Sequence, residues 1–457
     1  FAIKLFATQL TYEDDSIDDQ YDADANLPVI ASQTITAANA DDAITVEAPN
    51  TGVAVVVPAD DTNEGDTYML EVSNQSVEQN DMGETTVALD AELFKNNVKV
   101  ENSTTVYDLT FDIGAGATIT SVKHNDTALT AGTRDGHYEY DSATGILTIH
   151  TRSFSPFSVE FTGPAAVIGD VKYETVAAAF AAAVTGDTVK LIRNSIMPGN
   201  AGITVPAGKE LTLDLNGFKF SNAVNENKAS QVFMVIGTLT IKDTVGTGLL
   251  TNGIEEGTQP GEWWSTPQYN YVSNTITNCG TVIVESGKIT NTAVGSICYC
   301  IDNNSTSYDV VLNIKGGLIE KDGTAVRLFC NSTVKNNTLI MEGGKIKGAY
   351  TAFWVQLPGS AGAKKLATLD ISGGVIEADT YSFYDYSYGD VFDEVVYDIT
   401  GGTFLSERGV YSYGVENFIL GGLFEYEPDE DYIAGGYCAE QNGEGLWEVK
   451  VEESILA

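Results

Sequence analysis

Residues 312–319 read LNIKGGLI, and this short phrase returns along the second half of the chain. Each copy contains an alternating apolar segment, a pair of glycines and a further apolar residue. Full copies lie at 312–319, 339–346, 369–376, 397–404 and 418–424, and a weaker copy, VIVESGKI, lies at 282–289. The second glycines, at 287, 317, 344, 374, 402 and 422, recur every 20 to 30 residues. One strand-and-turn phrase per unit at this period predicts a solenoid.

The segment before the glycines alternates with a period of two. Leu312 and Ile314 should therefore face one side of a strand, and Asn313 and Lys315 the other. Two glycines then allow a tight corner that a residue with a Cβ atom would strain. Leucine-rich repeats have a similar length, but their consensus asparagine and helix are absent from these units. The phrase predicts an all-β fold, a right-handed parallel β-helix with one coil per repeat.

Length and charge limit the class of protein. The 457 residues suit a solenoid together with a smaller unit. With 24 basic and 64 acidic residues the formal net charge is −40, which argues against nucleic acid and anionic lipid as partners. No apolar run is long enough for membrane insertion. The chain begins with Phe1 and no signal peptide, so we expect a processed, trimmed or engineered chain. Acidic coils rich in glycine and asparagine favour a secreted or cell-surface protein of a bacterium.

Four segments are expected along the chain. Residues 1–27 combine an alternating strand, FAIKLFATQ, with an acidic linker of few apolar groups. Residues 28–163 hold short alternating strands separated by polar turns, the pattern of a β-sandwich. Residues 164–430 form the β-helix, opened by an Ala-rich capping helix around 177–183. Residues 431–457 form a C-terminal capping hairpin.

Two stretches resemble known bacterial surface proteins. Residues 173–192, YETVAAAFAAAVTGDTVKLI, resemble the opening cap of pectate-lyase-like right-handed β-helix domains of Firmicute-type cell-surface proteins, and the resemblance covers roughly residues 168 to 450. It implies the fold and says little about activity. Residues 4–16, KLFATQLTYEDDS, resemble the last strand of TasA/camelysin-type surface and biofilm proteins. This second resemblance covers about the first 22 residues and implies such a domain upstream in the parent protein.

A candidate ligand-binding strip follows the second strand of each coil. Aligning these strands predicts an inward column of Ile297, Val326, Phe353, Phe383 and Tyr411. The opposite parity forms an outward strip with coils about 4.8 Å apart, made up of Arg327, Trp354, Gln356, Tyr384 and Tyr386 together with Cys298, Cys300 and Phe329. Aromatic faces beside planar polar groups suit stacking on sugar rings, so the strip predicts glycan binding. Two alternatives stay open, a reversed parity and a long loop that covers the strip.

Catalysis has one candidate pair of carboxylates. Asp370 and Asp398 occupy the same outward position in successive coils, and retaining glycosidases hold their carboxyl groups about 5–5.5 Å apart. However, Asn313 and Ile340 fill the same column, and the solenoid contains no histidine. A solvated acidic face is therefore favoured. A polysaccharide lyase or glycoside hydrolase acting on the β-helix face is the rival function.

Metal sites and reactive side chains receive less support. Plentiful acids make calcium a candidate, although neither an EF-hand nor a calcium-binding nonapeptide repeat occurs. The five cysteines form no CxxC pair, so buried thiols are favoured over a zinc site. All three histidines fall in the expected sandwich, where solvated strand or turn positions are favoured over catalysis: His124, His137 and His150.

The favoured function is non-catalytic. We expect an extracellular surface protein for adhesion, glycan binding or matrix and filament structure, without a cofactor. Its expected partners are extracellular glycans or a host or matrix surface. Self-assembly is a further expectation, in which residues 1–10 add as a strand to the sheet of a neighbouring molecule.

Overall fold

The computed structural model describes residues 28–80, 84–197, 202–223, 230–253, 273–293, 298–357, 366–386 and 394–452. The chain divides into two units, Phe1–Pro164 and Ala165–Ala457. Each unit has its own hydrophobic core. Within the described ranges, no helix is long and apolar enough to cross a membrane.

The first unit consists of two antiparallel sheets that resemble a sandwich, as predicted. One sheet has the order β1-β4-β5-β13-β8-β9, with β6 beside β5, from β1 (Val29–Thr34), β4 (Thr67–Gln79), β5 (Glu84–Lys95), β6 (Val98–Lys99), β8 (Thr118–His124), β9 (Thr127–Ala128) and β13 (Phe157–Thr162). The other has the order β10-β11-β12-β7-β3-β2, from β2 (Ile44–Ala48), β3 (Val53–Val57), β7 (Tyr107–Asp112), β10 (Thr130–Ala131), β11 (His137–Asp141) and β12 (Ile146–Thr151), with β10 parallel to β11. Alternate residues such as Val53 and Val55 are buried between them, which is why these short strands alternate in polarity.

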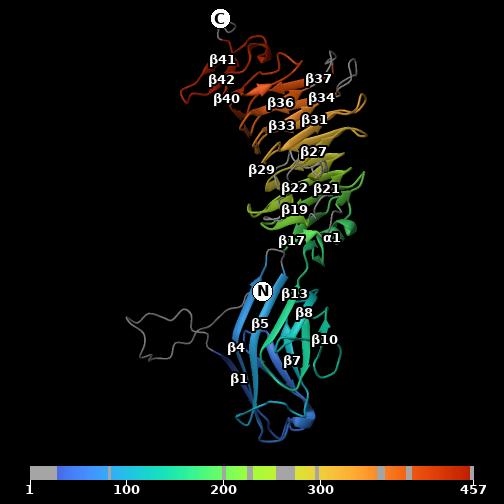
Figure 1. Cartoon of the computed structure of the whole chain (residues 1–457). Helices are drawn as coiled ribbons and strands as arrows, with labels where there is room; N and C mark the ends of the chain where they lie inside the picture. Colours follow the sequence, from blue (N-terminus) through green and yellow to red (C-terminus); the bar gives the residue numbers. More distant parts are fainter. Residues whose placement is uncertain are drawn as a thin grey trace, which may run out of the picture. The chain divides into compact units, whose positions relative to one another are not determined.

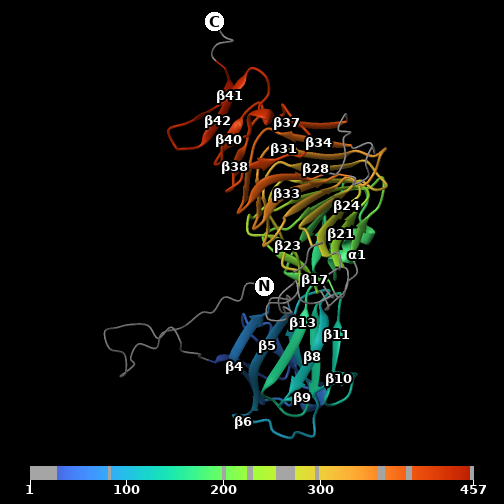
Figure 2. The same ribbon diagram turned by 45° about the horizontal axis from the view of Figure 1, so that its top comes forward.

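The second unit is the predicted β-solenoid, in which successive coils add one parallel strand to each of three sheets (Figures 1 and 2). The first sheet runs β16 (Thr188–Leu191), β19 (Glu210–Asp214), β22 (Thr238–Lys242), β25 (Thr281–Val284), β28 (Val310–Ile314), β31 (Asn337–Met341), β34 (Ala367–Ile371) and β37 (Val395–Ile399), preceded by the antiparallel β15 (Val171–Tyr173) and β14 (Ala166–Ile168). The second sheet runs β17 (Ser195–Met197), β20 (Lys219–Ala223), β23 (Leu249–Gly253), β26 (Lys288–Asn291), β29 (Leu318–Lys321), β32 (Lys345–Gly348), β35 (Val375–Ala378), β38 (Thr403–Leu405) and β40 (Gly422–Phe424). The third sheet runs β18 (Ile203–Val205), β21 (Ser230–Val235), β24 (Ser273–Asn278), β27 (Ile301–Asn304), β30 (Val326–Phe329), β33 (Thr351–Gln356), β36 (Tyr381–Tyr386) and β39 (Val410–Tyr411).

The glycine pair forms the corner between the first and second sheets. Gly344 has φ = 74°, a left-handed conformation that favours glycine. Its neighbour Gly343 is needed for a different reason, because a Cβ atom there would lie 2.6 Å from the carbonyl oxygen of Lys315 in the preceding coil. Equivalent glycines in the other coils show the same two features. The predicted column of stacked glycine corners is therefore confirmed.

Short elements cover the two ends of the solenoid. Helix α1 (Val176–Ala182) begins where Thr175 accepts a hydrogen bond from the backbone N–H of Ala178 at 3.0 Å. Its residue Phe180 packs edge-on against Phe233 of β21, with ring centroids 5.1 Å apart. At the other end of the unit (Figure 1), β42 (Trp447–Val451) pairs antiparallel with β40, and β41 (Tyr437–Gln441) pairs with β42. The antiparallel strands end the parallel stack.

Candidate functional site

Every second residue of the third sheet faces outward, and five coils place such residues in one column. The register joins Asp302 to Arg327, Arg327 to Trp354, Trp354 to Tyr384 and Tyr384 to Tyr411. We call this column, with the neighbouring outward residues Phe329 and Gln356, the aromatic strip. The alternate residues Val326, Phe353 and Phe383 are fully buried. Of the predicted site residues, Arg327, Trp354, Gln356 and Tyr384 therefore lie on the same outward face.

The prediction was wrong at both ends of this strip. Tyr411 lies outward beside Tyr384, and Val410 takes the inward position expected for it. Cys298 and Cys300 are buried, and Asp302 is the residue in register with Arg327, because the chain enters β27 later than the alignment assumed. The predicted positions of Ile297 and of the side chain of Tyr386 lie outside the described residues.

Arg327 begins the strip in a buried ion pair. Its Nε and Nη2 donate to the two carboxylate oxygens of Asp302, each at 2.8 Å, and the two residues are 8% and 2% exposed. The guanidinium carbon lies 4.6 Å from the ring centroid of Tyr299 and 4.5 Å from that of Phe329. Burial lowers the pKa of Arg327, but the hydrogen bonds and charge of Asp302 outweigh burial and raise it overall. Arg327 therefore stays charged and holds neighbouring coils and aromatic rings in place.

Trp354 and Gln356 continue the strip from β33. Gln356 Oε1 lies 3.5 Å from Nη1 of Arg327, so Arg327 also orients the amide. The indole Nε1 of Trp354 is buried and has no hydrogen-bond acceptor among the described residues. The ring itself is half-buried on the outward face beside Tyr384. Trp354 thus offers a partly exposed apolar ring surface rather than a polar group.

Three tyrosines pack together where the strip ends. Tyr384 stacks on Tyr411 with ring centroids 5.2 Å apart and planes 18° apart. Tyr381 lies against both rings, at 5.2 Å from Tyr384 and 6.0 Å from Tyr411. Burial raises the pKa of Tyr384, so its hydroxyl stays protonated at neutral pH. The guanidinium of Arg408 lies 5.9 Å from the Tyr381 ring centroid.

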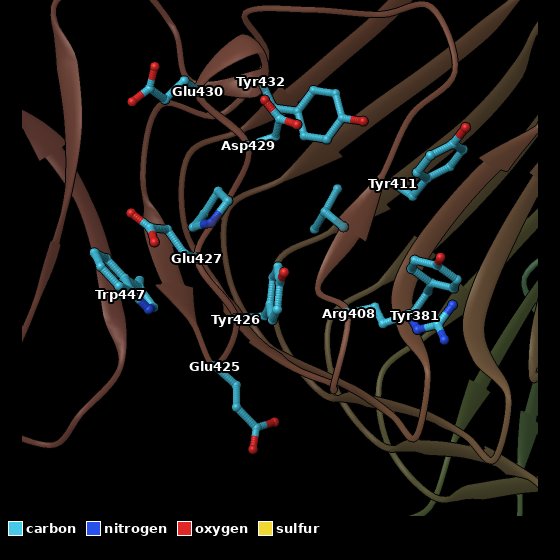
Figure 3. A pocket seen from close by; sticks show the side chains of 12 residues that line it. Tyr381, Arg408, Tyr411, Glu425, Tyr426, Glu427, Asp429, Glu430, Tyr432 and Trp447 are labelled. Carbon is cyan, nitrogen blue, oxygen red and sulfur yellow. The ribbon is translucent and has the colours of Figure 1, made fainter.

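An open hollow of about 910 Å³ lies beyond these tyrosines (Figure 3). Its aromatic lining comes from separate segments, with Tyr381 at the start of β36, Tyr411 in β39, Tyr426 after β40, Tyr432 in the short 3-10 helix η3 (Glu430–Tyr432), and Trp447 at the start of β42. In Figure 3, Trp447 and Tyr411 stand on opposite sides of the hollow with Tyr426 between them. Tyr381 and Tyr411 belong both to the tyrosine cluster and to the hollow, so the strip and the hollow form one continuous surface.

The wall between β40 and η3 is acidic. It contributes four exposed carboxylates, those of Glu425, Glu427, Asp429 and Glu430. Within the described part of the chain, none of them forms an ion pair with a lysine or arginine. Asp429 begins η3 by accepting a hydrogen bond from the N–H of Asp431 at 3.1 Å, and the Tyr432 hydroxyl donates to the carbonyl of Ser412 at 2.9 Å. The first bond is local to the loop, and the second holds the acidic loop against the last coil.

The rival catalytic pair lies on another sheet. Asp370 and Asp398 are in register on β34 and β37, as predicted, and both are exposed. Ile340 and Asn313 continue the column. Exposed positions lack the apolar surroundings that a general acid requires. In the ranges that the structure describes, no three His, Cys, Asp or Glu side chains are grouped so that they could hold a metal ion.

The histidines and cysteines lie outside the strip and the hollow. The predicted solvated position is wrong for His150, which is buried and lies 2.6 Å from Asp108 Oδ1 and 3.3 Å from Glu139 Oε2. His124 stacks on Phe157 with ring centroids 4.3 Å apart. Buried thiols are confirmed for three cysteines, Cys298, Cys300 and Cys330.

No protein-family model, no curated protein and no solved structure matches this chain. The site must therefore be interpreted from its own residues. Sequence reasoning missed the hollow, whose signal was the stretch EYEPDEDY at residues 425–432, dense in both aromatic and acidic residues.

Proposed function

We propose that this protein is a non-catalytic extracellular protein that binds a glycan chain along the aromatic strip and in the hollow. One observation supports this most directly. The packed tyrosines Tyr381, Tyr384 and Tyr411 join a row of outward aromatic rings to a hollow lined by three further rings, those of Tyr426, Tyr432 and Trp447. Adhesion or a role in a bacterial surface matrix is part of the same proposal.

The chemistry of sugars fits this surface. A pyranose ring has apolar C–H faces, which stack on aromatic rings, and a rim of hydroxyls, which need hydrogen-bond acceptors. The rings of Trp354, Tyr384 and Tyr411 supply the aromatic stacking surfaces, and the carboxylates of Glu425 and Glu427 supply the hydrogen-bond acceptors. Because Trp354, Tyr384 and Tyr411 are held on β-strands of stacked coils, their side chains lose little conformational entropy when a sugar binds.

The test is a glycan-array screen followed by calorimetry with Tyr411→Ala. Loss of one stacking ring should lower the affinity roughly tenfold, about 1.4 kcal/mol. Tyr308→Ala is the matched control, since Tyr308 is 45% exposed and does not line the hollow. Equal affinities for the Tyr411 and Tyr308 variants would refute the proposed surface.

The rival function is distinguished by turnover. Incubation of the bound polymer with the protein should release no shorter products. Product release that is lost in Asp370→Asn would establish a lyase or hydrolase instead. The glycan-array screen should be run once with calcium and once with a chelator, because the acidic composition makes calcium a candidate ligand.

Self-assembly through residues 1–10 is a separate part of the proposal, and these residues lie outside the described ranges. An exposed edge strand such as β1 offers unpaired backbone groups to an added strand. Deletion of residues 1–10 should abolish oligomers in sedimentation. The same oligomer in the truncated protein would reject strand addition.

A further inference from the structure

We propose that the hollow selects glycans that carry free amino groups, such as a de-N-acetylated hexosamine polymer. This inference rests on the proposed function and narrows its ligand class. The hollow combines two features that an ammonium group uses at once, aromatic ring faces and carboxylates that form no ion pair with a lysine or arginine of the described ranges.

The aromatic rings are the first argument. A cation within about 6 Å of a ring centroid is attracted by the negative face of the ring. Arg408 already occupies such a place over Tyr381 at one edge of the hollow. Among the described residues, no lysine or arginine lies over the rings of Tyr426 or Trp447. Tyr426 is 55% exposed, so a ligand can reach it.

The carboxylates are the second argument, because they decide between ligands that would stack equally well. Glu425, Glu427, Asp429 and Glu430 line the same hollow as the free ring faces, and no basic residue of the described chain forms an ion pair with them. An ammonium group on a stacked sugar would be attracted by these charges. The hydroxyl of a neutral sugar would gain only a hydrogen bond.

The same charges act against acidic sugars. A uronate would bring a carboxylate next to four others on a protein whose formal charge is −40. The hollow is therefore unsuited to pectin-type polymers, which consist largely of uronates. The charge of the hollow, rather than its shape, makes this distinction.

Calorimetry should compare three short oligomers that share a β-1,4-linked glucose-type backbone and differ only at C2, namely a glucosamine hexamer, its N-acetylated counterpart and cellohexaose. An α-1,4-linked oligogalacturonate, which differs also in its backbone, is the acidic arm. We expect the glucosamine hexamer to bind at least tenfold more tightly than the neutral oligomers, and the uronate not to bind. Raising the pH through the pKa of the sugar amine should remove the preference.

A matched pair of variants separates the hollow from general attraction to an acidic protein. The double variant Glu425→Gln/Glu427→Gln should lose the preference for the amino oligomer, whereas two exposed acids outside the hollow changed in the same way, Glu210→Gln/Glu285→Gln, should keep it. Tyr426→Ala should weaken all oligomers that bind. If both double variants behave alike, nonspecific charge attraction explains the binding and the inference is rejected.

The remaining outcomes are distinct. Equal affinity for the amino and N-acetylated oligomers would overturn the amine selectivity and leave glycan binding intact. Binding that a chelator abolishes and calcium restores would replace ammonium recognition by a calcium bridge. Absence of binding to every oligomer and to the glycan array would reject the proposed function itself.

Discussion

The ring of Tyr384 on β36 stacks on the ring of Tyr411 on β39, with centroids 5.2 Å apart and planes 18° apart. Tyr384 belongs to the column that runs from Asp302 to Tyr411, and Tyr411 also lines the hollow. This contact therefore joins the aromatic strip and the hollow into one surface. A ligand longer than one sugar could contact both parts.

We predict that Trp447 contributes its ring and not its indole N–H. Trp447→Ala should lower glycan affinity by about 1 kcal/mol, or roughly fivefold, because one stacking surface is lost. Trp447→Phe should keep most of the affinity, because a ring of similar orientation remains. Calorimetry with the glycan found in the array measures both. Equal losses in the two variants would mean that the N–H bond matters more than stacking.

The buried pair of Asp302 and Arg327 predicts a stability effect. Asp302→Asn leaves the buried guanidinium without its counter-charge and should lower the free energy of unfolding by about 3–5 kcal/mol. The double variant Asp302→Leu/Arg327→Met removes both charges and should recover much of this loss. Urea unfolding of the wild type, the single variant and the double variant provides the measurement. A double variant as unstable as the single one would contradict this account of an uncompensated buried charge.

The glycine corner predicts a position-specific cost. Gly344→Ala forces a side chain into a left-handed conformation, which alone costs about 1–2 kcal/mol, and also places the Cβ atom 2.7 Å from the backbone carbonyl of Gly316. Gly343→Ala should cost less than Gly344→Ala, because it meets only the steric conflict, with its Cβ atom 2.6 Å from the carbonyl oxygen of Lys315. Gly435→Ala is the control, since nothing lies within 4 Å of a Cβ atom there. Thermal unfolding that ranks the three differently would contradict the geometry of the corner.

In the first unit, Asp66 predicts a dependence of stability on acid. The hydrogen bond from Asn96 and the ammonium of Lys95 hold the pKa of Asp66 down, from 3.8 to about 2. Because the folded-state pKa is the lower one, this stabilisation is complete above about pH 4 and is lost as the pH falls towards 2. The stability difference between the wild type and Asp66→Asn should therefore shrink over that range.

Urea unfolding between pH 6 and pH 2 measures the contribution of Asp66. Asp60→Asn is the control, because Asp60 is an exposed neighbour in the short 3-10 helix η1 (Ala59–Asp61). A difference between the wild type and Asp66→Asn that does not change with pH would show that the carboxylate charge of Asp66 does not stabilise the fold.

Local patterns predicted the coil but not all of its register. The inward positions of Val326, Phe353 and Phe383 followed from alternation alone. Tyr411 was misplaced because β39 contains two residues, and a shift of one residue exchanges the two faces of a strand. At the other end of the column, the start of β27 was misplaced because the segment between β26 and β27 is longer than its counterparts in later coils. Alternation gives no information on how many residues a loop contributes before the next strand begins.

The amino-acid sequence by itself determined that the second half of the chain coils, because a glycine corner is a local requirement that repeats with the phrase. Only the tertiary structure decided which outward residues can meet a ligand. Arg327 is taken up by Asp302, which pairs with it from the preceding coil, while Tyr411 and Trp447 face a common hollow from different segments. The physical reason is that burial and ion pairing depend on long-range packing and on loop lengths. The alternation of polar and apolar residues within one repeat carries no information on either.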